Sequence, residues 1–264
     1  MSESIFSIKG KVALVTGGTS GIGYMIAEGL VKHGAKVYVA SRKADACAKT
    51  AEALSEFGEC IGIAADLSTE QGCLDLVAQL QEREPKLHVL VNNAGVTWGA
   101  KLEEYPAEAW DKIQNLNVKS AFVMTQKLLP MLEAAGNEAD PARVINITSV
   151  AGQVTASMLA YAYGPSKAAL NHLTKILAGE LAARCITVNA IAPGVFPSRM
   201  TKFAMKDEAS VQAQNEAVPL KRMGQPQDME GLAVFLSSPA SAYITGSVIC
   251  LDGGTSVKSP EVVQ

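Results

Sequence analysis

Three side chains within one short stretch have the chemistry needed to act on a carbonyl group. Ser149 follows an apolar, β-branched run typical of a buried strand, and Tyr163 and Lys167 are four residues apart in a helical pattern. That spacing places both on one helix face, where an ammonium would lower the pKa of the phenol from its usual value of about 10. A serine hydroxyl nearby could hold the same substrate oxygen. A tyrosine and a lysine on a solvated helix face would fit this stretch equally well.

A glycine-rich turn near the N-terminus has the context of a phosphate-binding loop. Residues 16–23 read Thr-Gly-Gly-Thr-Ser-Gly-Ile-Gly and connect an apolar run to a helical pattern. Glycines let the backbone approach a pyrophosphate at a helix N-terminus, although the spacing Gly-x-x-x-Gly-x-Gly differs from the usual Gly-x-Gly-x-x-Gly. A glycine-rich turn without a ligand is the alternative. We expect cofactor contacts from Gly17, Thr19, Ser20, Gly21, Ile22 and Gly23.

Strand-like and helix-like patterns alternate along the chain. Apolar runs predict strands over 12–15, 36–40, 60–64, 87–91, 143–148, 186–192 and 247–251. Helical patterns cover 23–33, 44–57, 70–83, 107–116, 118–135 and 163–183. Strands separated by helices predict a parallel sheet covered on both faces, with ligands at the carboxyl ends of the strands. We therefore expect an α/β fold: a single Rossmann-like, doubly wound domain over 1–264, with a seven-stranded parallel sheet flanked by helices.

The motifs follow the order and approximate spacing of the short-chain dehydrogenase/reductase family, which the chain resembles over essentially its whole length. The resemblance rests on residues 16–23, Asn92-Asn-Ala-Gly95, Asn117, Ser149, Tyr163-x-x-x-Lys167 and Pro193-Gly194. It implies a catalytic set of Asn117, Ser149, Tyr163 and Lys167, with a water held near Lys167 by a backbone carbonyl of a helix interrupted at Asn117. It also implies cofactor contacts from Asn93, Ala94, Gly95, Tyr163, Lys167, Pro193 and Gly194. From the residues alone, Asn117 could instead be an ordinary helix cap.

The end of the second predicted strand favours NADP(H) over NAD(H). An acidic residue there would bind the ribose hydroxyls and repel a 2′-phosphate, but this chain has Ser41-Arg42-Lys43, from which we expect cofactor contacts. Arg42 can fork onto a phosphate, whereas a plain surface arginine would leave the preference undecided. The family resemblance also places Asp66 and the backbone of Leu67 against the adenine. Asp66 could instead, or in addition, cap the helix that follows.

Substrate specificity is expected from three segments, 96–98, 151–159 and 195–220. The last mixes apolar and polar residues, and we predict that it is a substrate lid. If its apolar side chains line the pocket rather than pack internally, they suit an acyl chain or another lipophilic carbonyl compound. Residues 92–100, 162–170 and 196–201 also resemble NADPH-dependent β-ketoacyl reductases of the family.

Composition argues against several other classes of protein. The net charge is −3, the pI is about 5.7 and no run of Lys and Arg exceeds two residues, so nucleic acid and anionic membranes are not expected partners. The five cysteines are scattered without Cys-x-x-Cys spacing, so we expect neither a disulfide framework nor a metal site. No apolar run reaches about 18 residues, and a cytoplasmic location is expected. Helices over 118–135 and 163–183 resemble those through which the family associates, which implies a homotetramer or homodimer.

Together these features predict an NADP-dependent enzyme acting on CH–OH or carbonyl groups. Hydride would move from NADPH to the carbon of a β-ketoacyl or other lipophilic ketone while Tyr163 protonates the oxygen. Oxidation of a secondary alcohol, such as a steroid, sugar or polyol, is the main alternative. A non-catalytic NADP-binding regulator on the same fold is a further one, but such a protein need not retain the whole catalytic set.

Overall fold

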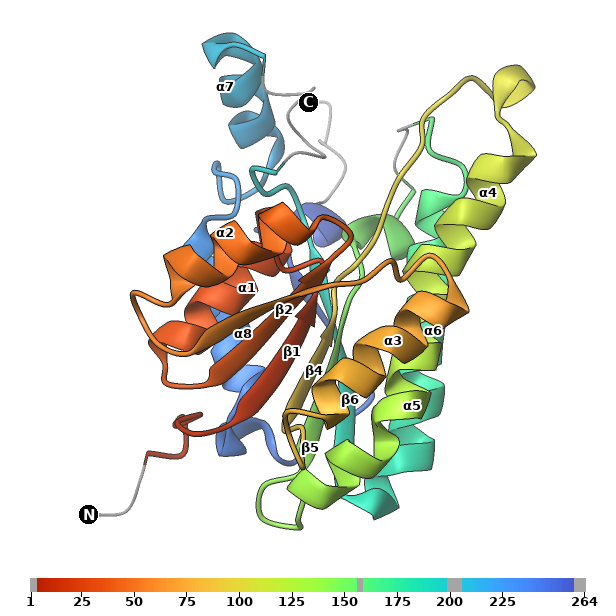
Figure 1. Ribbon diagram of the computed structural model, residues 1–264. Helices are drawn as coiled ribbons and strands as arrows, with labels where there is room; N and C mark the ends of the chain where they lie inside the picture. The colour runs from red at the N-terminus through yellow and green to blue at the C-terminus, as the bar shows by residue number, and fades with distance from the viewer. Residues whose placement is uncertain (1–3, 156–158, 199–205, 259–264) are drawn as a thin grey trace.

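Seven parallel strands form one sheet in the computed structural model, which describes residues 4–155, 159–198 and 206–258 (Figure 1). The strands are β1 (Val12–Thr16), β2 (Lys36–Ser41), β3 (Cys60–Ala64), β4 (Val89–Asn92), β5 (Ala142–Ile147), β6 (Ile186–Pro193) and β7 (Val248–Leu251). Their spatial order is β3-β2-β1-β4-β5-β6-β7, and every neighbouring pair is parallel. Each strand begins and ends within two residues of its predicted bounds, and the predicted fold class is confirmed.

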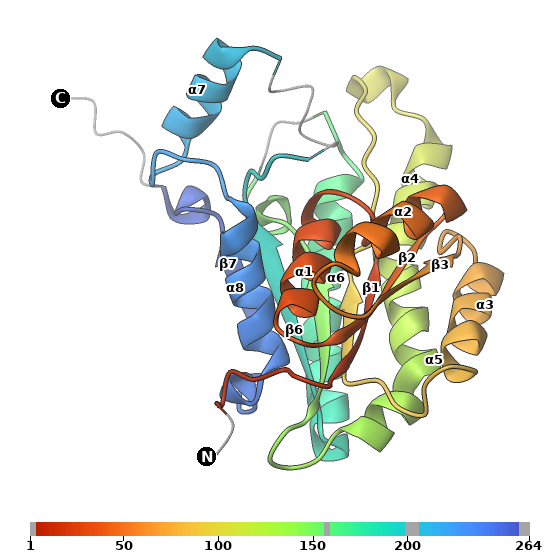
Figure 2. The same ribbon diagram turned by 60° about the vertical axis from the view of Figure 1, so that its left-hand side comes forward.

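Helices cover both faces of the sheet. They are α1 (Gly21–Lys32), α2 (Ala44–Leu54), α3 (Glu70–Gln81), α4 (Ala107–Gln114), α5 (Ser120–Ala135), α6 (Tyr163–Leu181), α7 (Glu208–Ala217) and α8 (Pro226–Ser237). Helices α1 and α8 lie on one face of the sheet, and α3, α5 and α6 lie on the other (Figure 1). One apolar core joins the sheet to the first pair, and a second joins it to the other three. None of the residues of α7 is buried, and the helix stands away from the sheet in both views (Figures 1 and 2). Among the described helices, none is both long and apolar enough to cross a membrane.

Helix α8 was not predicted from the sequence. Its close packing against α1 explains its place in the fold. It begins with Pro226, and the Asp228 carboxylate accepts a hydrogen bond from the Gln225 N–H at 2.8 Å. Its buried side chains face α1, where a Cβ atom on Gly29 would lie 2.6 Å from the Glu230 Cγ. Only glycine allows the two helices to approach this closely.

The strand order reverses between β1 and β4, and this reversal sets the position of the site. Crossover connections leave the sheet in opposite directions on the two sides of such a point, so a crevice forms at the carboxyl ends of the strands. The loops that follow β1, β4, β5 and β6 carry most of the predicted site residues, and all of them start at this edge.

A buried ionic cluster lies at the opposite, amino-terminal edge of the sheet. Lys11 and Arg143 both bind the Asp140 carboxylate, at 2.7 and 3.0 Å. Arg143 is 1% exposed and also donates to the Ser238 carbonyl oxygen at 2.8 Å. Burial lowers the pKa of both cations, and Asp140 offsets part of that effect. One carboxylate thus compensates two buried cations that tie β1 and β5 to the end of α8.

Candidate active site

Ser149 and Tyr163 are brought together beyond the end of β5. Ser149 caps the 3₁₀ turn Val150–Gly152, where its Oγ accepts from the Ala151 N–H at 3.2 Å. Tyr163 is the first residue of α6 and is 9% exposed. A Cβ atom on Gly152 would lie 2.7 Å from the Lys167 carbonyl carbon, so only glycine lets this turn pack directly on α6. This packing leaves Ser149 within hydrogen-bonding reach of the phenol.

Burial decides the protonation state of Tyr163. Desolvation raises the pKa of the phenol above its usual 10.0, and the hydrogen bond with Ser149 offsets part of the rise. The prediction that this pKa is lowered is therefore wrong, because burial sets the direction of the shift although the Lys167 Nζ lies 5.7 Å from the ring centroid. At neutral pH the phenol stays protonated, which is the form that a general acid requires.

Lys167 is enclosed between α6 and the end of β5. The residue is 4% exposed, and its Nζ donates to the Ile147 carbonyl oxygen at 2.8 Å. Burial lowers the pKa of Lys167 to about 8, so the ammonium form still predominates at neutral pH. A Cβ atom on Gly95 would lie 3.5 Å from this Nζ and 3.3 Å from the Asn117 Oδ1. The site therefore holds a cation one helical turn from the phenol.

Asn117 lies in a π-helical segment, Asn115–Lys119, between α4 and α5. The predicted interruption of the helix is confirmed, and the alternative of an ordinary terminal cap is wrong. The Asn117 Oδ1 accepts from the Val96 N–H at 2.8 Å, and Nδ2 donates to the Val96 carbonyl oxygen and to the Ser166 Oγ, each at 3.0 Å. This side chain joins the loop after β4 to α6, next to Lys167. That the segment holds a water stays a prediction.

Thr16 and Asn93 brace the glycine-rich loop from behind. The Thr16 Oγ1 donates to a β4 carbonyl at 3.1 Å and accepts from the N–H groups of Asn93 and Ala94 at 2.9 and 3.0 Å. The Asn93 Nδ2 donates to the carbonyl oxygens of Thr16 and Gly17 at 2.9 and 3.1 Å. A Cβ atom on Gly17 would lie 2.8 Å from this nitrogen, and one on Gly23 would clash with it. The loops after β1 and β4 therefore form one connected unit.

The N-terminus of α1 has no capping side chain. Ser20 stands at the cap position without a side-chain hydrogen bond to the first turn, which contains no acidic residue. Gly17 and Gly21 adopt left-handed conformations, with φ of 65° and 55°. Free backbone N–H groups and the positive end of the helix dipole favour an anion here. This donor set fits the diphosphate of a dinucleotide.

A cleft of about 320 Å³ joins the glycine-rich loop to Tyr163 and Lys167, whereas Asn117 and Ser149 are not among its lining residues. Most of the predicted cofactor contacts line it: Gly17, Thr19, Ser20, Gly21, Ile22, Ser41, Asn93, Ala94, Gly95, Tyr163 and Lys167. Gly23 is buried behind the loop, against Asn93. Ile147, Thr148 and Ser198 also line the cleft but were not predicted to contact the cofactor.

Four predicted contacts for the adenosine half do not line this cleft. Arg42 and Lys43 are exposed where β2 ends, Asp66 is exposed beyond β3, and Leu67 is buried. Burial opposes ionisation of Asp66, but hydrogen bonds from Ser68 and the charge of Arg42 lower its pKa overall. The cationic Arg42 thus lies close enough to act on Asp66, which places both at one end of the crevice.

One alternative role in the surrounding loops is corrected. The cap of α3 is Thr69, whose Oγ1 accepts from the Gly72 N–H at 3.1 Å, so Asp66 is not the helix cap. Pro193 and Gly194 are not among the residues that line the cleft, and their contact with the cofactor stays a prediction. Gly194 donates to the Leu251 carbonyl oxygen at 2.9 Å, and a Cβ atom on it would lie 2.8 Å from the Asp252 Cα. This pair holds β6 tightly against the end of β7.

A second pocket, of about 460 Å³, opens on the other side of Tyr163. Its described lining consists of Ala151, Gly152, Gln153, Val154, Thr155, Leu159, Ala160, Tyr161, Tyr163, Gly164, Pro165 and Ala168. None of these residues is an aspartate, glutamate, lysine, arginine or histidine. The predicted segment 151–159 thus lines this pocket together with Tyr161, apart from 156–158, which lie outside the described residues. Segment 96–98 lines a separate hollow of about 230 Å³ against α4.

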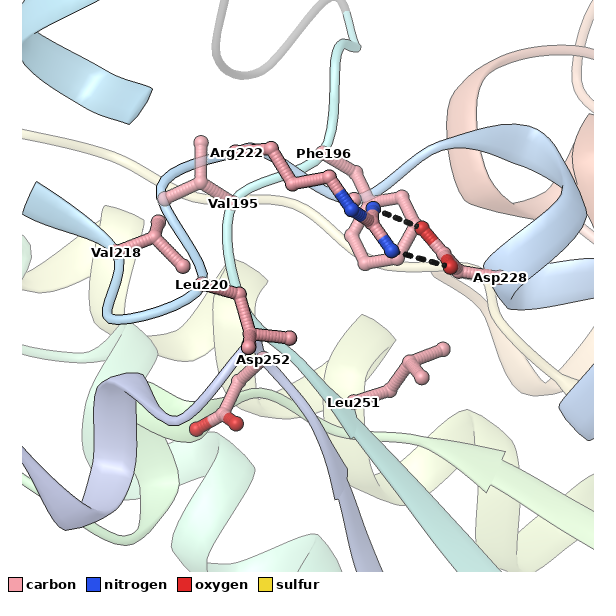
Figure 3. A pocket seen from close by; sticks show the side chains of 10 residues that line it. Val195, Phe196, Val218, Leu220, Arg222, Asp228, Leu251 and Asp252 are labelled. Carbon is pink, nitrogen blue, oxygen red and sulfur yellow. Dashed lines mark hydrogen bonds and ion pairs between the residues drawn. The ribbon is translucent and has the colours of Figure 1, made fainter. Parts of the chain in front are cut away.

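The two ends of the predicted lid meet in a small cavity of about 90 Å³ (Figure 3). Phe196 at the first end and Leu220 at the second line this cavity together with Leu251 of β7. Beside them, Arg222 donates two hydrogen bonds to the Asp228 carboxylate, at 2.6 and 3.0 Å. The cavity contains no member of the catalytic set, and residues 199–205 lie outside the described residues. The lid therefore stays a prediction.

Known proteins resemble the chain along nearly its full length. A family described as Enoyl-(Acyl carrier protein) reductase matches residues 17–256. The chain belongs to the short-chain dehydrogenase/reductase family. The Rhamnolipids biosynthesis 3-oxoacyl-[acyl-carrier-protein] reductase of Pseudomonas aeruginosa is 51% identical to this short-chain dehydrogenase/reductase, over 94% of the chain and 97% of its own length.

Two further relatives bear on the site of this short-chain dehydrogenase/reductase. The Pseudomonas aeruginosa RhlG/NADP active-site complex is 50% identical, with a TM-score of 0.94 over 97% of this chain and 100% of its own. The gluconate 5-dehydrogenase of Gluconobacter oxydans is 32% identical over 96% of this chain and 97% of its own length. The resemblance of residues 92–100, 162–170 and 196–201 to β-ketoacyl reductases is borne out as relatedness.

Asn146 and Thr174 are positioning residues of this short-chain dehydrogenase/reductase that were not predicted. The Asn92 Nδ2 donates to the Asn146 Oδ1 at 2.9 Å, and the Asn146 Nδ2 donates to the Thr174 Oγ1 at 2.9 Å. This buried chain links β4, β5 and α6 and shows that Asn92 supports the sheet, whereas Asn93 reaches the glycine-rich loop. The available signal was a polar residue inside an apolar strand run, as at Asn146.

Proposed function

We propose that this protein is an NADPH-dependent reductase that transfers a hydride to the carbonyl carbon of a lipophilic ketone, such as a 3-oxoacyl compound. The observation that carries the proposal is the uncharged pocket of about 460 Å³ beside Tyr163. Such a pocket favours an uncharged, apolar substrate, because a buried charge would go uncompensated there. By its name, the Pseudomonas aeruginosa relative acts on 3-oxoacyl substrates, which supports the same substrate class.

The catalytic set has a role for each step at the substrate oxygen. Ser149 would hold that oxygen, and the protonated Tyr163 would donate its proton to it as the carbonyl carbon is reduced. When bound, NADPH supplies the hydride. The Lys167 ammonium then favours the resulting phenolate by charge. Asn117 would keep the loop after β4 and helix α6 in register around this lysine through its hydrogen bonds to Val96 and Ser166.

Three features support NADP(H) as the cofactor. The uncapped N-terminus of α1 suits the diphosphate. Arg42 and Lys43 provide cations at the end of β2, where no acidic residue would repel a 2′-phosphate. The similar Pseudomonas aeruginosa structure is a complex of RhlG with NADP.

Oxidation of a sugar acid is the second candidate, raised by the gluconate 5-dehydrogenase relative. A carboxylate in the pocket would call for a cationic partner, and the described lining contains no lysine, arginine or histidine. This observation favours ketone reduction.

A panel of substrates assayed with both cofactors tests this proposal. We expect 3-oxoacyl esters and thioesters to be reduced faster with NADPH than with NADH. Gluconate with NADP⁺ should react slowly or not at all. The panel should include an enoyl thioester, because the matching family is described by that reaction. Faster turnover of gluconate, a polyol or the enoyl compound would overturn the proposal.

We also propose a homotetramer or homodimer in a reducing compartment such as the cytoplasm. Phe122 on α5 and Ile176 on α6 are 41% and 56% exposed, which leaves apolar surface on the helices expected to associate. All five cysteines are free, as expected of a reducing compartment. Sedimentation at micromolar concentration checks the assembly, and a fully active monomer would contradict it.

A further inference from the structure

Leu159 combines a strained backbone with an exposed apolar side chain. Its φ is 51°, in the left-handed region that a branched side chain rarely adopts. Among the described non-glycine residues, only Cys185 and Lys221 share a positive φ. Leu159 is 50% exposed, so internal packing offsets little of this strain. Glycine or asparagine would adopt the conformation at lower cost, so the leucine side chain needs another explanation.

Two hydrogen bonds fix the backbone around Leu159. Its carbonyl oxygen accepts from the Ala100 N–H at 3.0 Å, across the gap to the loop after β4. One residue later, the Ala160 carbonyl oxygen accepts from the Tyr163 N–H at 3.0 Å, where α6 begins. The strained residue is therefore held between two walls of the active site. Local strain that the surrounding structure imposes in this way is characteristic of ligand clamps.

The side chain of Leu159 lines the uncharged pocket beside Tyr163. Next to it, the Tyr161 ring packs edge-on against Tyr105, with ring centroids 5.5 Å apart, so this wall of the pocket is fixed by contacts across the gap. We propose that Leu159 is a specificity-determining residue, whose side chain contacts the aliphatic chain of the ketone substrate. This inference rests on the proposed function and names the residue that distinguishes long chains from short ones.

Leu159→Asn isolates the contact, because asparagine is similar in size and tolerates the left-handed conformation. The probes are ethyl 3-oxoalkanoates from four to ten acyl carbons, reduced with NADPH. Covering the remaining half of a leucine side chain corresponds to about fivefold in KM, or about 1 kcal/mol. We therefore expect KM to rise about fivefold for the ten-carbon ester and hardly at all for the four-carbon ester. Turnover should stay within about twofold of the wild type.

Two matched variants control for strain and for volume. Cys185→Asn relieves a left-handed residue at the far end of α6 and should leave the dependence of KM on chain length unchanged. Leu159→Met keeps an apolar side chain and should retain most of the affinity for the ten-carbon ester. The thermal midpoint of Leu159→Asn should not fall, because the substitution removes strain and little packing.

The outcomes separate this inference from the proposed function. If the wild type reduces none of the esters, the proposed function fails, and the inference fails with it. If the wild type reduces them and Leu159→Asn changes KM by the same factor at every length, or not at all, only the inference fails. A marked fall in the thermal midpoint would also overturn it, by showing that Leu159 is a packing residue.

Discussion

Lys167→Met should stabilise the protein while it removes a member of the catalytic set. Burial lowers the pKa of Lys167 from 10.5 to about 8. Because the pKa of Lys167 falls by about 2.5 on folding, keeping this lysine protonated lowers the stability of the folded protein by about 3 kcal/mol at pH 7. The variant loses the hydrogen bond to the Ile147 carbonyl, which costs about 1 kcal/mol. Because Ile147 lines the cleft, water can take over part of that bond. The net gain should be about 2 kcal/mol.

The stability difference between the variant and the wild type should depend on pH, because it arises from the lowered pKa of Lys167. Because the folded pKa lies below the unfolded one, the unfolded wild type binds more protons between about pH 8 and pH 10.5. The stability of the wild type therefore rises with pH relative to that of the variant. The disadvantage of about 3 kcal/mol at pH 7 should shrink to about 1 kcal/mol at pH 9.5. The advantage of the variant should fall by the same difference.

Urea denaturation measures the free energy of unfolding of both proteins at several pH values between pH 7 and pH 9.5. Both proteins are first dialysed free of cofactor. Lys175→Met is the matched control, because this lysine is exposed on the same helix and should change stability by less than about 0.5 kcal/mol. A variant less stable than the wild type at pH 7 would refute the reasoning. So would a stability difference that does not change with pH.

Three further substitutions test other parts of the structure. Tyr163→Phe keeps the ring, so NADPH binding by fluorescence titration should survive, while turnover of a verified ketone falls at least about 100-fold; near-full turnover would place the proton donor elsewhere. Arg42→Ala should weaken NADPH binding about 10- to 100-fold and NADH binding far less, and an equal effect on both cofactors would make Arg42 a plain surface residue. Asp140→Asn leaves the buried Lys11 and Arg143 uncompensated and should lower the free energy of unfolding by about 3 kcal/mol in urea; a loss under about 1 kcal/mol would show that the cluster is not needed.

The sheet was predictable because its central strands, β1, β4, β5 and β6, are fully buried and therefore mostly apolar. Apolar runs such as residues 12–15 or 186–192 identify a β-strand and place its first and last residues closely. Helices α7 and α8 were missed for different reasons. Helix α7 has no buried face, so it lacks an apolar period. Helix α8 follows a segment already assigned to the lid, and its start at Pro226 was not used as a signal.

The site was predictable as a set of residues, but not in the properties that depend on burial. The approach of Tyr163 and Ser149 follows from their places on α6 and after β5. The direction of the Tyr163 pKa shift does not, because the sequence gives no measure of desolvation. Alternation at the end of a strand predicts that the side chains of Asn92 and Asn93 point to opposite sides. The sequence does not tell which of them bonds to Asn146 in the sheet and which bonds to the glycine-rich loop.

The bracing of the glycine-rich loop by Asn93 has a consequence for how a dinucleotide binds. Its amide joins the loop after β1 to the loop after β4, so these two walls of the cleft are preorganised when the chain folds. Little ordering entropy then opposes association. The fixed spacing also makes the dinucleotide a bivalent ligand, whose second half binds at high effective concentration once the first is seated. Mononucleotides, which engage only one half of the cleft, should therefore be poor competitors.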